Sequence, residues 1–191
     1  MNTNKIKIVQ TATALFAKYG IKSVDISRIA KDAEVSEKAI ETEFNSMEQL
    51  LEACLQHEIK LLETEVSEAV WQAQSSLELL TGAVSTFFAG LSRFCTAFYC
   101  DLRKFPLIQK QVFSYKEKIQ NRCIDYFMEC EKDGYFTKEF NMESVALIYF
   151  ETVGNIEYKY QANVIRLFLK SICTEKGVNE ISRIETERNF L

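Results

Sequence analysis

The sequence predicts an all-α fold, in which an N-terminal three-helix helix-turn-helix domain is followed by a larger C-terminal helical domain. The 191 residues include one proline and six glycines, too few for the many turns of a strand-rich fold. Hydrophobic residues make up 47% of the chain, enough for a sizeable core, and they recur at helical spacing instead of alternating. We therefore expect two domains, spanning residues 1–46 and 47–191.

Three short helices are expected before residue 46. The first has an apolar face and should end at Gly20, which suits the position just past a helix end; that face carries Ile8, Ala12, Leu15, Phe16 and Tyr19. Ser23 or Asp25 can cap a second helix, whose inner face would carry Ile29 and Ala30. After a tight turn at residues 33–35, Ser36 caps a third helix that runs to about Phe44.

Long helical segments are expected over the rest of the chain. A capping box at residues 46–49 opens a helix that should end near residue 75. Further helices are predicted at residues 77–104, 107–132, 141–160 and 163–175, the last closed by Gly177. The highly charged tail, residues 178–191, is expected to be frayed or loosely docked.

Two short helices joined by a tight turn form a helix-turn-helix pattern, in which the second helix can enter a major groove. The stretch Ile8–Leu50 resembles the DNA-binding domain of the tetracycline-repressor (TetR) family. The resemblance rests on Ala14-Leu15-Phe16, Gly20, Ile29-Ala30, Ala33, Val35-Ser36, Ile40, Phe44-Asn45-Ser46, Glu48 and Leu50. It implies a homodimer that binds palindromic operator DNA through paired recognition helices and releases it when a small molecule enters the C-terminal domain.

The expected DNA interface lies on the second and third helices and just before them. It comprises Lys22, Asp25, Arg28, Ser36, Glu37, Lys38, Ala39, Glu41 and Thr42. Within it, the third-helix residues Ser36, Lys38, Ala39 and Thr42 are predicted to face DNA. Lys22 and Arg28 would lie near phosphates, whose neutralisation supplies much of DNA affinity. The formal net charge of −4 means that any contact with DNA comes from a local patch.

Four glutamates give the third helix and the turn before it a negative charge, and three of them depart from the family pattern. The family usually has Gly where this chain has Glu34, a phosphate-contacting Tyr at Glu41, and an aromatic residue or His at Glu43. With Glu37, residues 34–44 hold four glutamates and one lysine. An alternative function is therefore a TetR-like protein that has lost operator binding and acts as a small-molecule or protein-binding module.

Aromatic residues of the C-terminal domain suggest a mostly apolar cavity for an unknown small apolar ligand, although each could equally be core. The predicted lining is Phe87, Phe94, Phe98, Phe113, Tyr126 and Tyr149. The resemblance also implies that the last two helices form a two-fold dimer interface; the alternative is that they pack only within the monomer. The expected interface residues are Val145, Ile148, Val153, Ile165, Phe168, Leu169 and Ile172.

Several function classes are not supported by the sequence. No Gly-rich phosphate loop or nucleophile motif is present, so neither an enzyme nor a cofactor is expected. Six cysteines without a C-x-x-C pair, and a single histidine, His57, predict buried reduced thiols and no metal site. His57 is expected to be exposed. No secretory signal is visible, and the uncharged stretch Leu79–Ser92 is shorter than the about 20 residues that span a bilayer. We therefore expect no membrane association and a cytoplasmic protein.

Overall fold

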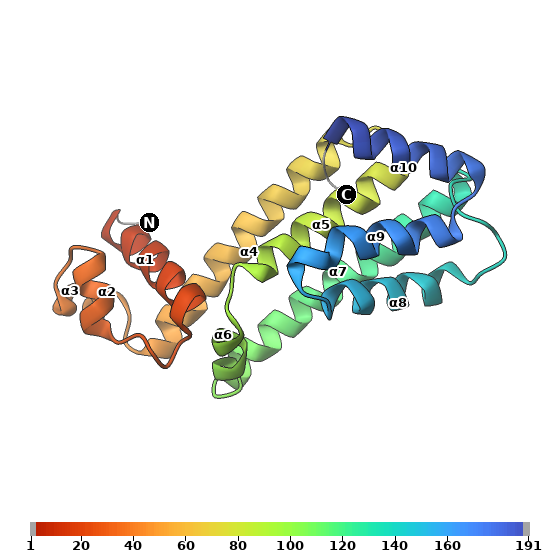
Figure 1. Cartoon of the computed structure of the whole chain (residues 1–191). Coiled ribbons are helices and arrows are strands. Elements are labelled where there is room, and N and C mark those ends of the chain that lie inside the picture. Colours follow the sequence, from red (N-terminus) through yellow and green to blue (C-terminus); the bar gives the residue numbers. More distant parts are fainter. Residues whose placement is uncertain (1–2, 189–191) are drawn as a thin grey trace. The chain divides into compact units, whose positions relative to one another are not determined.

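The computed structural model describes residues 3–188, and this part of the chain is all-α, as predicted (Figure 1). It forms α1 (Thr3–Tyr19), α2 (Ile26–Asp32), α3 (Glu37–Glu43), α4 (Met47–Gln72), α5 (Ser76–Ser92), α6 (Thr96–Leu102), α7 (Pro106–Lys132), α8 (Met142–Gly154), α9 (Tyr158–Ile172) and α10 (Glu175–Arg188). None of these helices is both long enough and apolar enough to span a bilayer.

The chain divides into two compact units that do not follow the expected domain boundary. The first unit comprises Met1–Leu62 with Leu91–Tyr115, and the second comprises Glu63–Gly90 with Lys116–Leu191. The start of α4, all of α6 and the start of α7 therefore pack with α1–α3. A functional boundary near residue 46 stays a prediction, because compactness alone does not test it.

The first unit has one apolar core, built around α1. Four of the five residues predicted for the inner face of α1 are buried, and only Tyr19 is partly exposed. The core extends through α2 and α3 into α4, and on to Phe98 and Leu102 of α6 and Ile108 of α7. The helix-turn-helix is thus stabilised by residues that lie far from it in sequence.

The helix expected at residues 77–104 is broken, and that prediction was wrong. α5 ends at Ser92 and α6 begins at Thr96. At the break the Cys95 N–H donates to the carbonyl of Ala17 in α1, at 2.8 Å. α6 then lies against the turn after α1, where Gly20 has φ +81° and a Cβ would come within 2.9 Å of the Ala97 Cβ. Residues 91–96 contain neither proline nor glycine, so this break could not be predicted from the local sequence.

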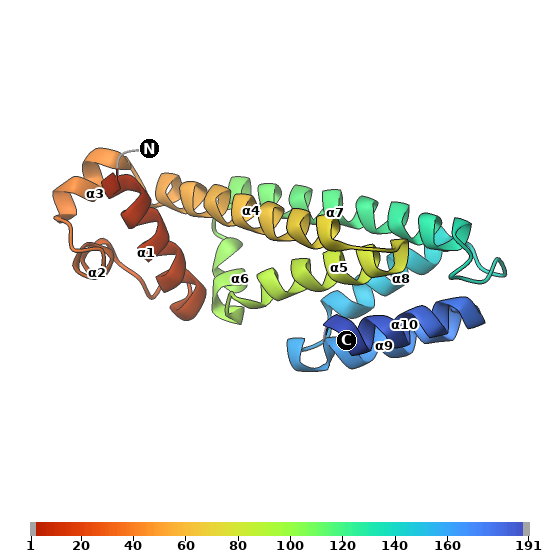
Figure 2. The same ribbon diagram turned by 90° about the horizontal axis from the view of Figure 1, so that it is seen from above.

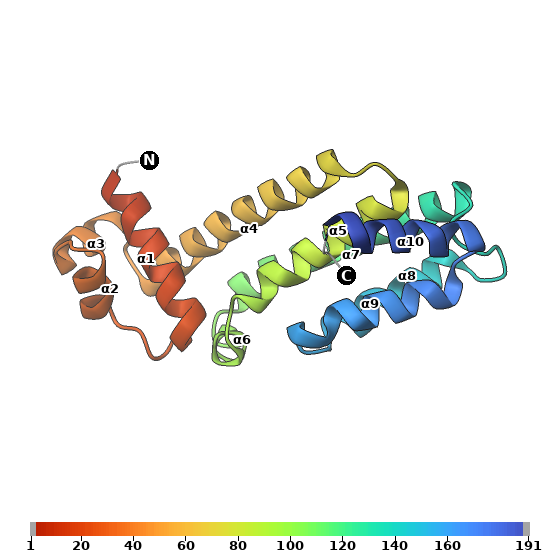
Figure 3. The same cartoon turned by 45° about the horizontal axis from the view of Figure 1, so that its top comes forward.

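In the second unit, α5 contacts α8 and α10. Phe87 of α5 stacks on Phe150 of α8 with ring centroids 5.8 Å apart, and α8 and α9 lie side by side (Figure 3). The helix expected at residues 141–160 ends instead at Gly154, and the next begins at Tyr158 rather than Asn163. The buried Gln161 side chain donates to the Val153 carbonyl at 3.0 Å, which satisfies a carbonyl at the end of α8 and fixes the turn.

The charged tail is a docked helix, so the expectation of a frayed end was wrong for the described residues up to 188. α10 lies beside α9 (Figure 2), and its Ile181 and Ile184 are fully buried. Gly177 does not close the preceding helix. It lies in the first turns of α10, where a Cβ would clash with the Tyr135 carbonyl oxygen. Residues 189–191 of the predicted tail lie outside the described residues.

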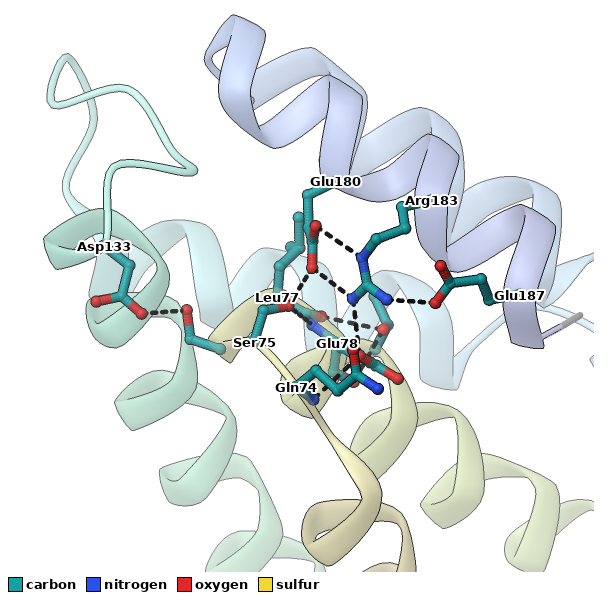
Figure 4. Close-up of polar contacts among 10 residues, drawn as sticks. Gln74, Ser75, Leu77, Glu78, Asp133, Glu180, Arg183 and Glu187 are labelled. Atoms are coloured by element: carbon teal, nitrogen blue, oxygen red, sulfur yellow. Dashed lines mark hydrogen bonds and ion pairs between the residues drawn. The ribbon is translucent and has the colours of Figure 1, made fainter.

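A polar network also fixes α10 to the start of α5 (Figure 4). The Arg183 guanidinium pairs with Glu78 of α5 at 2.9 Å and with Glu180 at 2.8 Å. Glu180 also accepts a hydrogen bond from the Ser75 hydroxyl. Glu78 is only 2% exposed, and a buried carboxylate requires such a partner to offset its lost hydration.

Candidate functional site

Side-chain caps begin both helices of the helix-turn-helix. The Asp25 carboxylate accepts a hydrogen bond from the Arg28 N–H at 2.8 Å, so Asp25 and not Ser23 caps α2. The Ser36 hydroxyl accepts from the Ala39 N–H at 3.2 Å and caps α3, as the sequence predicted. Both residues of the expected DNA interface therefore also have a structural role.

Three residues orient α3 relative to α2. Ala30 and Ile40 are buried and Val35 is half-buried against the same core. The Val35 N–H closes the turn by donating to the Ala30 carbonyl at 3.0 Å. Glu34, in the position where the family usually has Gly, adopts φ +53°, which costs an L-residue about 1 kcal/mol. The tight turn expected at residues 33–35 is confirmed.

The face of α3 opposite Ile40 is open to solvent. Lys38, Glu41 and Thr42 are exposed, whereas Ala39 is half-buried. The Thr42 hydroxyl donates to the Lys38 carbonyl at 2.7 Å. The helix therefore presents an exposed polar surface that carries the Lys38 ammonium and the Glu41 carboxylate, next to the exposed Glu37 at the helix start.

The glutamates around α3 are not equivalent. Glu34 pairs with Lys7 of α1 at 2.7 Å, and this ammonium lowers the pKa of the Glu34 carboxyl. Glu43 lies 3.8 Å from the Lys5 ammonium. Glu37 accepts a hydrogen bond from the Ser27 hydroxyl at 2.7 Å. Glu41 alone among the four has no side-chain partner within residues 3–188.

Lys22 and Arg28, predicted near phosphates, are each positioned by another side chain. The Lys22 ammonium lies 3.1 Å from Asp101 of α6, and the Lys22 N–H donates to the same carboxylate at 2.9 Å. The Arg28 guanidinium covers the Tyr19 ring at 4.0 Å. Lys22 is exposed and Arg28 half-buried. Sequence reasoning missed Asp101, because nothing local links it to a lysine 79 residues earlier.

Residues 8–54 match the family of bacterial regulatory proteins described as the tetR family. The match covers the helix-turn-helix, so residues 8–54 resemble the DNA-binding domain of the TetR family. No curated protein matches the chain closely enough to count as a relative.

Similarity to solved structures extends over nearly the whole chain. A transcriptional regulator from Saccharomonospora viridis in complex with choline is 17% identical, covering 92% of this chain and 100% of that chain with a TM-score of 0.78. A regulator from Cytophaga hutchinsonii is 21% identical, with 87% and 97% covered and a TM-score of 0.68. The ketosteroid regulator KstR2 of Mycobacterium tuberculosis is 16% identical, with 92% and 97% covered and a TM-score of 0.66. These identities show a shared fold.

The six residues predicted for a ligand cavity are divided between the two units. Phe94 and Phe98 contact each other in the first unit with ring centroids 4.4 Å apart, and Phe113 of the same unit is 59% exposed. Phe87, Tyr126 and Tyr149 belong to the second unit. Tyr149 is fully buried between Phe127 and Phe168, at 5.1 and 5.3 Å. Its hydroxyl has no hydrogen-bond partner among the described residues.

Four of the seven residues predicted for the dimer interface belong to the protomer core, and for these the prediction needs correction. They are Val153, Ile165, Leu169 and Ile172, all at most 7% exposed. Their helical spacing identified the inner faces of α8 and α9. Ile148 is 59% exposed, and Val145 and Phe168 are half-buried. The outer surface instead carries Leu147 and Leu167, 37% and 66% exposed.

The first unit contains a cavity of about 260 Å³ that the sequence did not predict. It lies between α1, α4 and the α5–α6 connection, and of the expected ligand residues only Phe94 lines it. His57, expected to be exposed, is half-buried in its wall. The buried Thr13 hydroxyl in the same wall has no hydrogen-bond partner among the described residues.

The cysteines are only partly as expected. Cys54, Cys123 and Cys130 are buried, Cys95 and Cys173 are half-buried, and Cys100 is exposed. Burial raises the pKa of the Cys54 and Cys123 thiols to about 12, so both stay protonated at neutral pH. Within residues 3–188, no group of three or more His, Cys, Asp or Glu side chains is placed to hold a metal ion.

Proposed function

We propose that this protein is a TetR-family transcriptional repressor that binds operator DNA as a homodimer and responds to a small molecule. The observation that carries the proposal is the exposed outer face of α3, presented by the buried Ala30–Ile40 packing. A helix held in this way can enter a major groove, as the second helix of a helix-turn-helix does. Lys38 on that face would supply contacts to DNA, together with Lys22 and Arg28.

The ion pairs around α3 weaken the alternative of a protein that has lost operator binding. That alternative rested on four glutamates facing DNA. Glu34 and Glu43 instead face lysines of α1, so their charges are opposed by neighbouring ammonium groups before any DNA approaches. Electrostatic repulsion of phosphates is correspondingly smaller. We therefore favour operator binding.

A buried, unpaired hydroxyl supports a small-molecule site in the second unit. Leaving a buried donor unsatisfied costs about 1–3 kcal/mol, and Tyr149 carries such a group in apolar surroundings. A mostly apolar ligand with one polar acceptor would offset that cost. The Saccharomonospora viridis structure, in complex with choline, supports ligand binding by a protein of this fold.

Exposed apolar side chains support a homodimer through α8 and α9. Leu147, Ile148 and Leu167 lie on the outer surfaces of these two adjacent helices. Large exposed apolar groups gathered on one surface are typical of protein–protein interfaces. A two-fold interface would pair two α3 helices, as a palindromic operator requires.

A DNA-binding titration tests the proposal. Purified protein is titrated with labelled DNA from upstream of its own gene, at several salt concentrations and with unlabelled competitor. We expect a specific complex whose affinity falls as salt rises, because binding releases counterions from neutralised phosphates. Lys38→Ala should weaken the complex, whereas Lys138→Ala, at an exposed lysine between α7 and α8, should not. Absence of a complex even at low salt would contradict the proposal.

A further inference from the structure

Among the acidic side chains of α3 and the turn before it, only that of Glu41 has no hydrogen bond or ion pair within residues 3–188. Glu34 and Glu43 pair with Lys7 and Lys5, and Glu37 accepts from Ser27. Within the described part of the chain, neither the Glu41 nor the Lys38 side chain forms a hydrogen bond or ion pair. A free carboxylate on a DNA-facing surface needs a hydrogen-bond donor on the DNA, because opposite a phosphate it would be repelled.

Lys38 and Glu41 also share one surface of α3. They lie three residues apart, and such residues are neighbours on a helix, with Cβ atoms about 5–6 Å apart. At about 100° per residue, Lys38 lies about 160° and Glu41 about 100° around the helix from the buried Ile40, so both positions face away from the core. Thr42, which lies on the same surface, donates its hydroxyl hydrogen to the Lys38 carbonyl and has none left to offer. The surface therefore presents one charged donor next to one charged acceptor.

This donor–acceptor pair matches one kind of base pair. In the major groove a G·C pair presents two acceptors, guanine N7 and O6, followed by one donor, the cytosine N4 amino group. In an A·T pair the only donor, adenine N6, lies between two acceptors, N7 and O4, which repel a carboxylate. Cytosine N4 has an acceptor on one side only. A lysine beside a glutamate is thus complementary to guanine and cytosine.

We propose that Glu41 reads a cytosine in each operator half-site by accepting a hydrogen bond from its N4 amino group, while Lys38 contacts the guanine of the same or the adjacent base pair. This assignment rests on the proposed function, because it presupposes that α3 enters the major groove. It makes Glu41 a specificity determinant at the position where the family resemblance implies a phosphate-contacting tyrosine.

Selection of bound DNA from a random library tests the assignment. The full-length protein, Glu41→Gln and Glu43→Gln are each used, and the enriched fragments are sequenced. We expect the unmodified protein to enrich cytosine at one symmetric position of a palindrome. Glu41→Gln should lower the preference for cytosine there by about tenfold, in favour of adenine, which glutamine contacts through N6 and N7. The other positions should be unchanged.

Glu43→Gln carries the same chemical change two residues along the helix, but its carboxylate faces Lys5. It should leave base preference unchanged at every position. Equal changes in affinity for all sequences with Glu41→Gln would place the carboxylate near phosphates and overturn the assignment. A motif whose cytosine persists in Glu41→Gln would also overturn it while leaving the proposed function intact. No enriched motif with any of the three proteins would overturn both.

Discussion

Tyr149 combines complete burial with a hydroxyl that has no partner among the described residues. Tyr149→Phe removes only this oxygen. We expect the free energy of unfolding to stay the same or to rise by about 1 kcal/mol, because an unsatisfied donor is deleted and the ring packing is retained. Urea unfolding followed by circular dichroism measures the change. If the hydroxyl serves a ligand, the variant should keep DNA binding but lose sensitivity to the inducing molecule.

Tyr99→Phe is the control for this deletion, because its hydroxyl has a partner. The Tyr99 hydroxyl donates to the Leu91 carbonyl at 2.7 Å, so its loss should reduce the free energy of unfolding by about 0.5–1 kcal/mol. The two substitutions should therefore have opposite or clearly different effects. A larger loss for Tyr149→Phe than for Tyr99→Phe would show that the Tyr149 hydroxyl is satisfied in the folded protein.

Asp101 makes stability depend on pH. Burial of the Asp101 carboxyl raises its pKa. Hydrogen bonds from the Lys22 backbone and ammonium, the positive charge of Lys22 and a hydrogen bond from the Ile21 backbone lower the pKa by more. The pKa of Asp101 therefore lies below its ordinary value. A carboxyl whose pKa is lowered on folding stabilises the fold above its unfolded pKa, about 3.9. That contribution is lost as the pH falls through the folded pKa.

Asp101→Asn should therefore destabilise the protein by about 1–2 kcal/mol at pH 7. The difference from the unmodified protein should shrink as the pH falls from about 4 through the lowered folded pKa of Asp101, because the carboxyl then becomes uncharged like the amide. Urea unfolding at pH 7 and at successively lower pH measures it. Asp125→Asn, at an exposed position of α7, should stay within about 0.5 kcal/mol. A difference that does not change with pH would contradict the charge-based explanation.

Among the helices, α10 is highly charged, yet its buried side chains should contribute to the stability of the fold. Ile181 and Ile184 are three residues apart and fully buried, and the Arg183 network fixes the helix to α5. Ile184→Ala should lower the free energy of unfolding by about 2–4 kcal/mol, through lost burial and a residual cavity. Ser182→Ala, on the exposed side, should change it by less than about 0.5 kcal/mol. A negligible effect of Ile184→Ala would indicate a frayed helix.

Helix starts were predictable where a capping side chain marks them, and helix breaks were not. Ser36 and Asn141 accept hydrogen bonds from the residues three positions on, as their sequences imply. The breaks after Ser92 and Gly154 are stabilised by contacts from elsewhere, such as the Ala17 carbonyl at the first. α10 was missed because its many charges outnumber a narrow apolar stripe, and only its tertiary partners show that the stripe is buried.

In the candidate DNA surface, too, features set by local contacts could be predicted from the sequence and features set by tertiary contacts could not. The packing of Ala30, Val35 and Ile40 is local, so the orientation of α3 could be inferred from the sequence. The pairing of glutamates with α1 could not, because residues 34 and 7 are brought together only by the fold. For the dimer surface, apolar spacing alone did not distinguish the inner from the outer faces of α8 and α9, since both carry large apolar side chains.

For the whole molecule, the proposed function depends on assembly, because a palindromic operator is bound by two copies of a protein. Leu167→Glu places a charge on the outer surface of α9, where Leu167 is 66% exposed. Burying an unpaired carboxylate in an apolar interface is unfavourable, so we expect a monomer by sedimentation velocity. Folding should be retained, because the side chain has little contact with its own core. Leu107→Glu, at a leucine 69% exposed on α7, should leave the oligomeric state unchanged.

The same variant connects assembly to DNA binding. Two linked α3 helices bind an operator far more tightly than either alone, because the second contact forms at high effective concentration. Leu167→Glu should therefore lower the affinity for a full palindrome by at least about 100-fold and that for an isolated half-site very little. A dimeric Leu167→Glu would show that the α8–α9 surface is not the interface. A monomer with undiminished affinity for the palindrome would instead contradict two-fold recognition.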